Sequence, residues 1–373
     1  MKICDIVKFN RESYSNKDNF LYVNYLDTGN ITMNKVDEIQ FIDLKEEKLP
    51  SRARRKVKVN NIIYSTVRPN QCHYGIIKEI PDNFLVSTGF AVMEVDEKKV
   101  DPDYLYYWLT MTERTEKLHA IAEQSVSTYP SIKPSDIGDL EIELPDLSTQ
   151  RKIKNILSSI DSKIVVNNRI NDNLYVQAES IYKEFFSSTE TATNMKTLDM
   201  FCNIFTGKKN SNANDINGQY KFFTCSPNAL LINSYIYDGN AIIVSGNGAY
   251  TGRTRFYSGK FDLYQRTYAC TIKDGINPDY IFPLYWFVKL ELSKKIMGGT
   301  RGSAIPYIVM NDLAKFSFIK NESFEKYIET FKSLTMLIQE NENQNEYLTN
   351  LRDSLLPKLM SGEINVEDIN LDI

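Results

Sequence analysis

A heptad pattern constrains this chain more than any other feature of its sequence. In residues 147–188, apolar and asparagine positions recur at alternating steps of four and three. Such a seam predicts a long helix that pairs with another helix. The positions of this seam are Ile153, Leu157, Ile160, Ile164, Asn167, Asn171, Leu174, Ala178, Ile181 and Phe185.

The same spacing returns in residues 324–360, where the seam starts at Tyr327, 174 residues after Ile153 (327 minus 153). We therefore expect the two long helices to pair with each other in antiparallel fashion. The positions of the second seam are Tyr327, Phe331, Leu334, Ile338, Asn341, Asn345, Leu348, Arg352, Leu355 and Leu359.

Asparagines occupy matching positions in both seams, at Asn167 and Asn171 and at Asn341 and Asn345. A buried seam asparagine lowers stability but fixes the register of two helices, so we assign these four residues to helix pairing. The alternative is that they mark where each helix becomes solvated. If they fix the register, replacing Asn171 and Asn345 with leucine should stabilise the coil while loosening or shifting the pairing.

The segments outside the helices also repeat. Ala241–Ser245 echoes Asn61–Ser65, and Asn277-Pro278-Asp279-Tyr280 echoes Asp101-Pro102-Asp103-Tyr104 at an offset of 176 (278 minus 102). In both tetrapeptides an Asn or Asp cap precedes a proline, which predicts the start of a helix. Short apolar runs predict strands at residues 61–66, 84–87, 90–95 and 137–144.

We therefore assign the chain to the α+β class, as an internal duplication with a pseudo-twofold relation. Two similar mixed α/β domains, residues 1–146 and 191–320, are separated by two long helices that form an antiparallel coiled coil. The helices occupy residues 147–190 and 321–373, the second with the C-terminal tail. Pro357 is expected to kink or end the second helix, and Gly362 to close it.

Composition narrows the function classes. With 42% hydrophobic and 25% charged residues the chain is typical of globular proteins. No apolar run is long enough to span a bilayer and no signal peptide is evident, so a cytoplasmic location is expected. Five scattered cysteines and two histidines argue against a zinc site or a disulfide framework.

The charge of the chain is unevenly distributed. Residues 321–373 carry 4 Lys and Arg against 11 Asp and Glu, or −7, so the rest of the chain, with a total of −4, carries +3. A nucleic-acid partner is therefore permitted by charge but is not demanded by it.

The order of globular domain, long helix, globular domain and long helix resembles the specificity subunit of Type I restriction-modification systems. Local motifs carry the same resemblance along nearly the whole chain, and a short N-terminus is its one visible departure. The motifs are Tyr64–Asn70, Leu85–Val92, Ser245–Gly252, Tyr264–Tyr268, Leu144-Pro145 through Gln150–Ile153, and Leu351–Gly362.

This resemblance implies that each globular domain reads half of a split site in double-stranded DNA. It also implies two modification subunits, which methylate adenine with S-adenosylmethionine, and restriction subunits driven by ATP. Both cofactors would be bound by these partners and none by this chain, which would have neither a metal nor a catalytic residue of its own.

Base reading needs polar side chains on exposed loops, and phosphate binding needs cations. We predict as DNA-binding residues Arg68, Asn70, Gln71, His73, Tyr74, Lys208, Lys209, Asn210, Asn247, Tyr250, Thr251, Arg253 and Arg255. Residues 124–129 and 300–303 are secondary candidates. For any single residue, a solvated turn is the simpler interpretation, and the duplication favours the loops as groups.

Apparent catalytic motifs have structural explanations. Asn277-Pro278-Asp279-Tyr280 resembles the motif of amino-methyltransferases, but it begins a capped helix, and Gly246, Gly248 and Gly252 fit hairpin turns with positive φ. Two other hypotheses stay open, a methyltransferase-like enzyme that acts alone and a coiled-coil scaffold without a nucleic-acid role. Binding of the methyl donor by the purified chain would favour the first.

Overall fold

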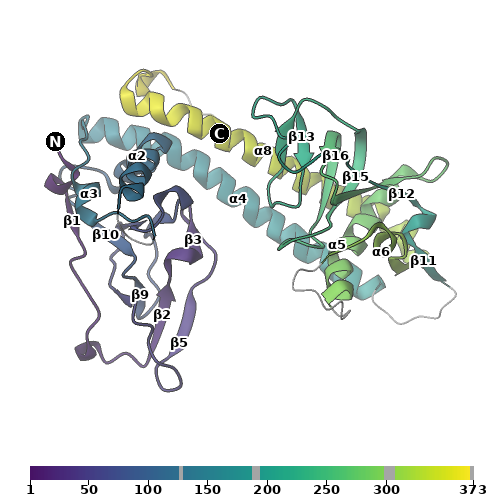
Figure 1. The fold of residues 1–373 in the computed structure, drawn as a ribbon, viewed down its shortest axis with the longest axis horizontal. Helices are drawn as coiled ribbons and strands as arrows, with labels where there is room; N and C mark the ends of the chain where they lie inside the picture. The colour runs from purple at the N-terminus through teal and green to yellow at the C-terminus, as the bar shows by residue number, and fades with distance from the viewer. Residues whose placement is uncertain (126–128, 187–193, 298–306, 370–373) are drawn as a thin grey trace. The chain divides into compact units, whose positions relative to one another are not determined.

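The computed structural model describes residues 1–125, 129–186, 194–297 and 307–369 (Figure 1). It divides into two compact units. Unit 1 comprises Met1–Lys163 and Leu348–Ile373, and unit 2 comprises Ile164–Tyr347. Both mix helices and sheets, which confirms the mixed α/β class. Among the described residues, no helix combines the length and apolarity that a membrane span requires.

The central sheet of unit 1 has the order β1-β10-β7-β8, with all neighbours antiparallel. Its strands are β1 (Val7–Phe9), β7 (Ile62–Ser65), β8 (Tyr74–Ile76) and β10 (Phe90–Val95). The run Ile62-Ile63-Tyr64 is buried throughout because both faces of the sheet are covered: Ile62 and Tyr64 join one core cluster and Ile63 another. The strands predicted at 61–66 and 90–95 are thereby confirmed.

A second sheet of unit 1 has the order β5-β2-β9-β6. It consists of β2 (Tyr22–Leu26), β5 (Gln40–Asp43), β6 (Ala53–Arg55) and β9 (Phe84–Ser87), the last of which was predicted. A separate small hairpin pairs β3 (Ile31–Thr32) with β4 (Lys35–Val36).

Unit 1 also contains the short helices α1 (Pro102–Leu109), α2 (Thr112–Glu123) and α3 (Pro134–Gly138). The predicted cap is confirmed, because the Asp101 carboxylate accepts hydrogen bonds from the backbone N–H groups of Asp103 and Tyr104. The strand predicted at 137–144 is wrong. Pro134 begins a helix whose Asp136 carboxylate accepts from the N–H of Lys133 at 2.6 Å, and beyond it only Glu141 forms a bridge, with Lys2.

The sheet of unit 2 has the order β12-β17-β15-β16-β13-β14. Its strands are β12 (Cys202–Thr206), β13 (Tyr220–Phe223), β14 (Leu230–Ile232), β15 (Tyr237–Ser245), β16 (Thr254–Leu263) and β17 (Thr267–Ile272), and β11 (Met195–Thr197) pairs separately with β18 (Ser317–Ile319). The antiparallel run β12-β17-β15-β16 repeats the strand order β1-β10-β7-β8 of unit 1.

The helices of unit 2 cover this sheet. A 3-10 turn at Pro278–Tyr280 leads into α5 (Ile281–Met297), and α6 (Met310–Ala314) and α7 (Glu322–Lys326) follow. The Asn277 side chain accepts from the N–H of Asp279, which confirms the predicted helix start. Trp286 is fully buried, and its indole Nε1 donates to Thr335 Oγ1 at 2.9 Å.

The two long helices are α4 (Leu147–Phe186) and α8 (Ile328–Ser361), and each contributes a segment to both units. In unit 1, Arg352 Nη1 donates to Asp161 Oδ1 at 2.7 Å. In unit 2, the amide Nδ2 of Asn341 donates to Asn171 Oδ1 at 2.8 Å, and that of Asn167 donates to Asn345 Oδ1 at 2.9 Å. Within unit 2 the numbers rise along one helix as they fall along the other, so these segments run antiparallel.

The ends of α8 test two further predictions. Pro357 was expected to kink or end the helix; the helix continues through it to Ser361, so Pro357 does not end it. Gly362 follows directly with a φ of 74°, as a closing residue should.

Candidate nucleic-acid interface

The predicted loop of unit 1 turns out from the sheet between β7 and β8. It forms a short 3-10 turn, Pro69–Gln71, and the side chains of Arg68, Asn70 and Gln71 are exposed. The Arg68 N–H donates to Pro130 O at 2.9 Å, and its guanidinium lies 5.2 Å from the ring of Tyr129, which is 58% exposed. Stacking on an aromatic ring holds an arginine fork in place while its donors stay accessible.

His73 is oriented by its neighbours. Its Nδ1 lies 2.6 Å from Ile31 O and 3.3 Å from Thr32 Oγ1. A carbonyl oxygen only accepts hydrogen bonds, so Nδ1 carries the proton in the neutral ring and Nε2 is then an acceptor. Neutral His73 can accordingly accept a hydrogen bond from an amino group.

Tyr74 does not belong to this surface, which corrects its assignment as a DNA-binding residue. Its side chain is 4% exposed, and its ring stacks on that of Tyr64 with centroids 5.4 Å apart. Burial raises the pKa of Tyr74 well above its ordinary value. Tyr74 and Tyr64 are direct partners across β7 and β8, which explains why this side chain points into the core.

The structure adds the β3–β4 hairpin to this site, which sequence reasoning missed. Met33 N–H donates to Cys72 O at 2.9 Å, Asn34 N–H donates to Tyr74 O at 2.8 Å, and Asn34 Oδ1 accepts from Ile76 N–H at 2.9 Å. A side chain at Gly75 would come within 2.7 Å of Asn34 Oδ1, so the glycine permits this close approach. The local sequence signal is Asn34, a residue type favoured at the centre of two-residue hairpin turns.

The predicted residues of unit 2 lie on two loops. The first loop follows β12 and carries Lys208, Lys209 and Asn210. The backbone of Lys209 forms an isolated β-bridge with Tyr264. Asn247, Tyr250 and Thr251 lie between β15 and β16, together with Arg253. The φ values of Gly248 and Gly252 are 80° and 83°, which confirms them as turn glycines. Gly246 has no positive φ, and a Cβ there would meet Arg266 O at 2.4 Å.

Arg253 repeats the arrangement seen at Arg68. Its guanidinium lies 5.0 Å from the ring of Tyr250, and both side chains are exposed. Within the described ranges, neither Arg68 nor Arg253 forms an ion pair. The backbone near each arginine is also paired in a similar way. Val67 forms an isolated β-bridge with Ser131 in unit 1, and Asn247 forms one with Tyr307 in unit 2.

Arg255 is not a loop residue, which corrects a second prediction. It lies on β16, is only partly exposed, and its guanidinium donates to Ser226 O and lies 5.8 Å from the Phe223 ring. Burial, with Arg253 nearby, lowers its pKa. Its hydrogen bond within the protein indicates a role in supporting the adjacent loop.

Lys289 of α5 adds a third cation near these arginines. Its Nζ lies 4.6 Å from the Tyr175 ring. Its pKa is lowered to about 8, chiefly by burial; Glu342 opposes this shift, and Arg253 and Arg255 add to it. This part of unit 2 is therefore electropositive, with Glu342 as the anion that offsets it.

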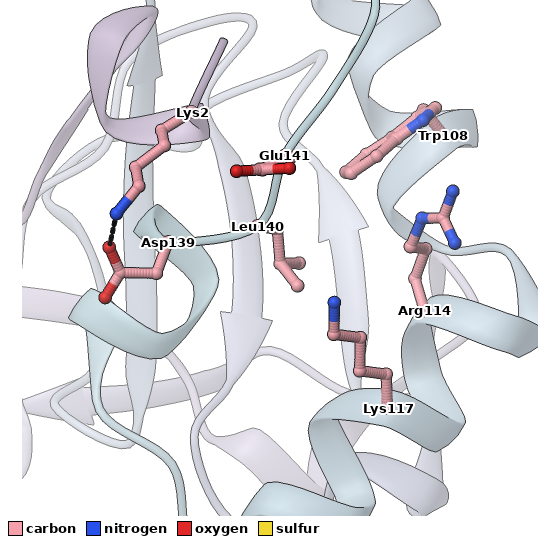
Figure 2. Close-up of a pocket in the computed structure, with 7 residues that line it drawn as sticks. All are labelled: Lys2, Trp108, Arg114, Lys117, Asp139, Leu140 and Glu141. Carbon is pink, nitrogen blue, oxygen red and sulfur yellow. Dashed lines mark hydrogen bonds and ion pairs between the residues drawn. The ribbon is translucent and has the colours of Figure 1, made fainter.

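A separate hollow of about 420 Å³ in unit 1 contains none of the predicted residues (Figure 2). Its charges are mixed: Lys2 pairs with Asp139 at 2.7 Å, while the Arg114 guanidinium lies 4.8 Å from the Trp108 ring. Lys117 and Glu141 complete the charged lining (Figure 2). Nearly balanced charge gives this hollow little attraction for phosphate.

Apart from Tyr74 and Arg255, the predicted residues therefore lie in two surface groups, one in each unit. Across the described part of the chain, no group of three His, Cys, Asp or Glu side chains is placed to hold a metal. Of the secondary candidates, residues 126–128 and 300–303 lie outside the described residues.

Comparison with known proteins gives a family match for part of this chain. Residues 1–175 match the protein family described as the Type I restriction modification DNA specificity domain. The specificity subunit of the Type I restriction enzyme HindI of Haemophilus influenzae is 33% identical over 162 residues, which cover 43% of this chain and 35% of that protein.

The EcoDI specificity subunit of Escherichia coli is 34% identical over 191 residues, which cover 48% of this chain and 41% of that protein. The matches thus span less than half the length of these two relatives. The crystal structure of a Type I restriction-modification S subunit from M. genitalium aligns with a TM-score of 0.56 and 18% identity over 96% of this chain and 95% of that chain, a likeness of fold.

Proposed function

We propose that this chain, which is similar to Type I restriction-modification specificity subunits, reads a two-part DNA target and directs partner subunits to it. Modification subunits would methylate adenine in each half of the target, and restriction subunits would cleave unmethylated DNA. The observation that carries this proposal is the pair of exposed Arg–Tyr contacts, Arg68 with Tyr129 and Arg253 with Tyr250.

Internal duplication supports a split target. The strand orders β1-β10-β7-β8 and β12-β17-β15-β16 are the same, and the arginine of each Arg–Tyr contact lies on the loop that follows the equivalent strand, β7 or β15. A duplicated reading domain is the economical way to recognise two half-sites. We propose residues 1–146 and 191–320 as the two reading domains, related by a pseudo-twofold axis, with the helices of residues 147–190 and 321–373 as an antiparallel spacer.

Each loop offers the donors and acceptors that base reading requires. An arginine fork binds guanine or phosphate, and the amides of Asn70 and Gln71 match the edge of adenine. Lys208, Lys209 and Asn210 would anchor phosphates in unit 2, and Asn247 and Thr251 would read base edges. The chain itself would bind neither S-adenosylmethionine nor ATP, which belong to the partner subunits in this proposal.

Exposed apolar side chains on the helix segments of unit 2 support docking of modification subunits there. Exposed apolar residues grouped on one element mark interaction surfaces. On α4 they are Val165, Val166, Ile170 and Val176, and on α8 they are Met336, Leu337 and Tyr347.

The test is DNA binding by the complex of this chain with its modification subunits. Arg68→Glu and Arg253→Glu should each weaken binding to the methylated target by at least tenfold and reduce the salt dependence of binding. Arg151→Glu, an equal charge reversal at an exposed site on α4, should leave both unchanged. Equal binding by all three variants would refute the assignment of the loops.

A further inference from the structure

Backbone strain in unit 1 is concentrated at one place. The described residues include eight non-glycine residues with positive φ, of which five are asparagine, the residue type that tolerates this conformation best after glycine. The other three are Met33, Arg68 and Cys72, with φ values of 48°, 48° and 56°.

Hydrogen bonds join these three residues into a single surface. Met33 N–H donates to Cys72 O at 2.9 Å, and Cys72 N–H donates to Pro69 O at 3.0 Å, one residue after Arg68. The tip of the β3–β4 hairpin therefore lies against the loop that carries Arg68, Asn70 and Gln71. Strained residues gather where the surrounding structure holds them for a function.

Met33 is the member of this group whose side chain has no structural explanation. It occupies the first central position of a two-residue turn, where glycine, asparagine or aspartate is favoured, and it is 56% exposed. Its neighbour Asn34 has a clear role, since its Oδ1 accepts from Ile76 N–H. An apolar side chain held in water by a strained backbone contributes nothing to folding, so its use is to be sought in binding.

We propose that Met33 is a specificity-determining residue that packs against the methyl group of a thymine in the half-site read by unit 1. This inference rests on the proposed function. The thymine methyl is the one apolar feature of the major-groove edge, and methionine is a flexible, polarizable partner for it. Lys35 on β4 is exposed beside Met33 and adds a cation for the adjacent phosphate.

Met33→Gly is the principal variant because it relieves the backbone strain at the positive φ of residue 33. Glycine adopts the turn conformation freely, so this change should raise the midpoint of thermal unfolding by about 2 °C. It also removes the apolar contact, so the complex with modification subunits should bind its target about five- to tenfold more weakly. If Met33 had only a structural role, Met33→Gly would not both raise the stability of the protein and lower its affinity for DNA.

The decisive experiment replaces thymine with deoxyuridine, which removes only the methyl group. Each thymine of the half-site, on both strands, is replaced in turn. The wild-type complex should lose affinity about five- to tenfold at one position, while Met33→Gly and Met33→Gln should be insensitive there. Met33→Leu should retain the methyl dependence. Met195→Gln, at a 50% exposed methionine of unit 2, serves as the matched control and should behave as wild type.

Two results separate this inference from the function on which it rests. If the wild-type complex shows no target-specific binding, the proposed function fails; if Arg68→Glu binds normally, the assignment of the unit 1 loop fails. If the wild type binds and Arg68→Glu does not, but Met33→Gly binds as wild type or keeps the same methyl dependence, the role of Met33 alone is refuted.

Discussion

Leucine at Asn341 should destabilise the protein, whereas leucine at both Asn341 and Asn171 should stabilise it. Asn171 is 5% exposed, and its Oδ1 accepts the hydrogen bond of Asn341 Nδ2 at 2.8 Å. Asn341 is partly exposed. This pairing also corrects the predicted Asn171/Asn345 double replacement, which would remove one member from each of two pairs.

The change in unfolding free energy depends on which amide groups each variant leaves without a hydrogen-bond partner. Asn341→Leu leaves a buried acceptor without its partner, which costs about 1–3 kcal/mol, and a partly exposed leucine recovers only a fraction of this. We expect a net loss of about 1 kcal/mol. The double variant leaves no unpaired amide and buries the leucine that replaces Asn171, so a gain of about 1 kcal/mol is expected.

Urea unfolding monitored by circular dichroism measures both effects, provided that the slope of free energy with urea is unchanged. A double-mutant cycle with Asn171→Leu then gives the coupling between the two sites, expected at about 1–2 kcal/mol. Additive single effects would refute the pairing. A lower stability of the double variant than of Asn341→Leu would refute the argument about unpaired amides.

Three further predictions concern single contacts. Gly75→Ala should destabilise unit 1 by about 1–3 kcal/mol in urea unfolding, because its Cβ would lie 2.7 Å from Asn34 Oδ1, and hydrogen exchange should rise in the β3–β4 hairpin. Arg352→Met should cost about 1–2 kcal/mol by the same assay, since it removes the donor 2.7 Å from Asp161 Oδ1 and leaves that carboxylate with Tyr107 alone. Lys289→Met should raise stability at pH 7. The folded pKa of Lys289, about 8, lies below its unfolded value of 10.5, so the unfolded chain binds more protons between these values and the contribution of Lys289 to stability rises with pH over that window. The difference between wild type and variant should shrink from pH 8 to pH 10.5, and a difference independent of pH would contradict the shift.

Several local features of this fold were readable from its sequence, although the strand predicted at 137–144 was wrong. The heptad seams predicted the two long helices, and the Asp101 and Asn277 caps marked helix starts that the structure confirms. These features depend on spacing within a few residues, which the sequence states directly.

Contacts between distant segments were harder to predict. Heptad spacing identifies the paired face of a helix but not which asparagine meets which, and Asn171 meets Asn341. Tyr74 looked like a loop residue because its cross-strand partner, Tyr64, is invisible in local sequence. The β3–β4 hairpin contacts the loop near Cys72, which lies some forty residues later in the chain. No local sequence pattern predicts this contact.

Mapping methylated adenines in DNA exposed to the complex of this chain with the proposed modification subunits tests the central claim most directly. We predict methylation within one two-part sequence, with an adenine in each half and a fixed gap between the halves. Arg68→Glu should abolish or relax recognition of one half, and Arg253→Glu should do the same to the other. Methylation without a two-part sequence, or an identical pattern in both variants and the wild type, would contradict the account.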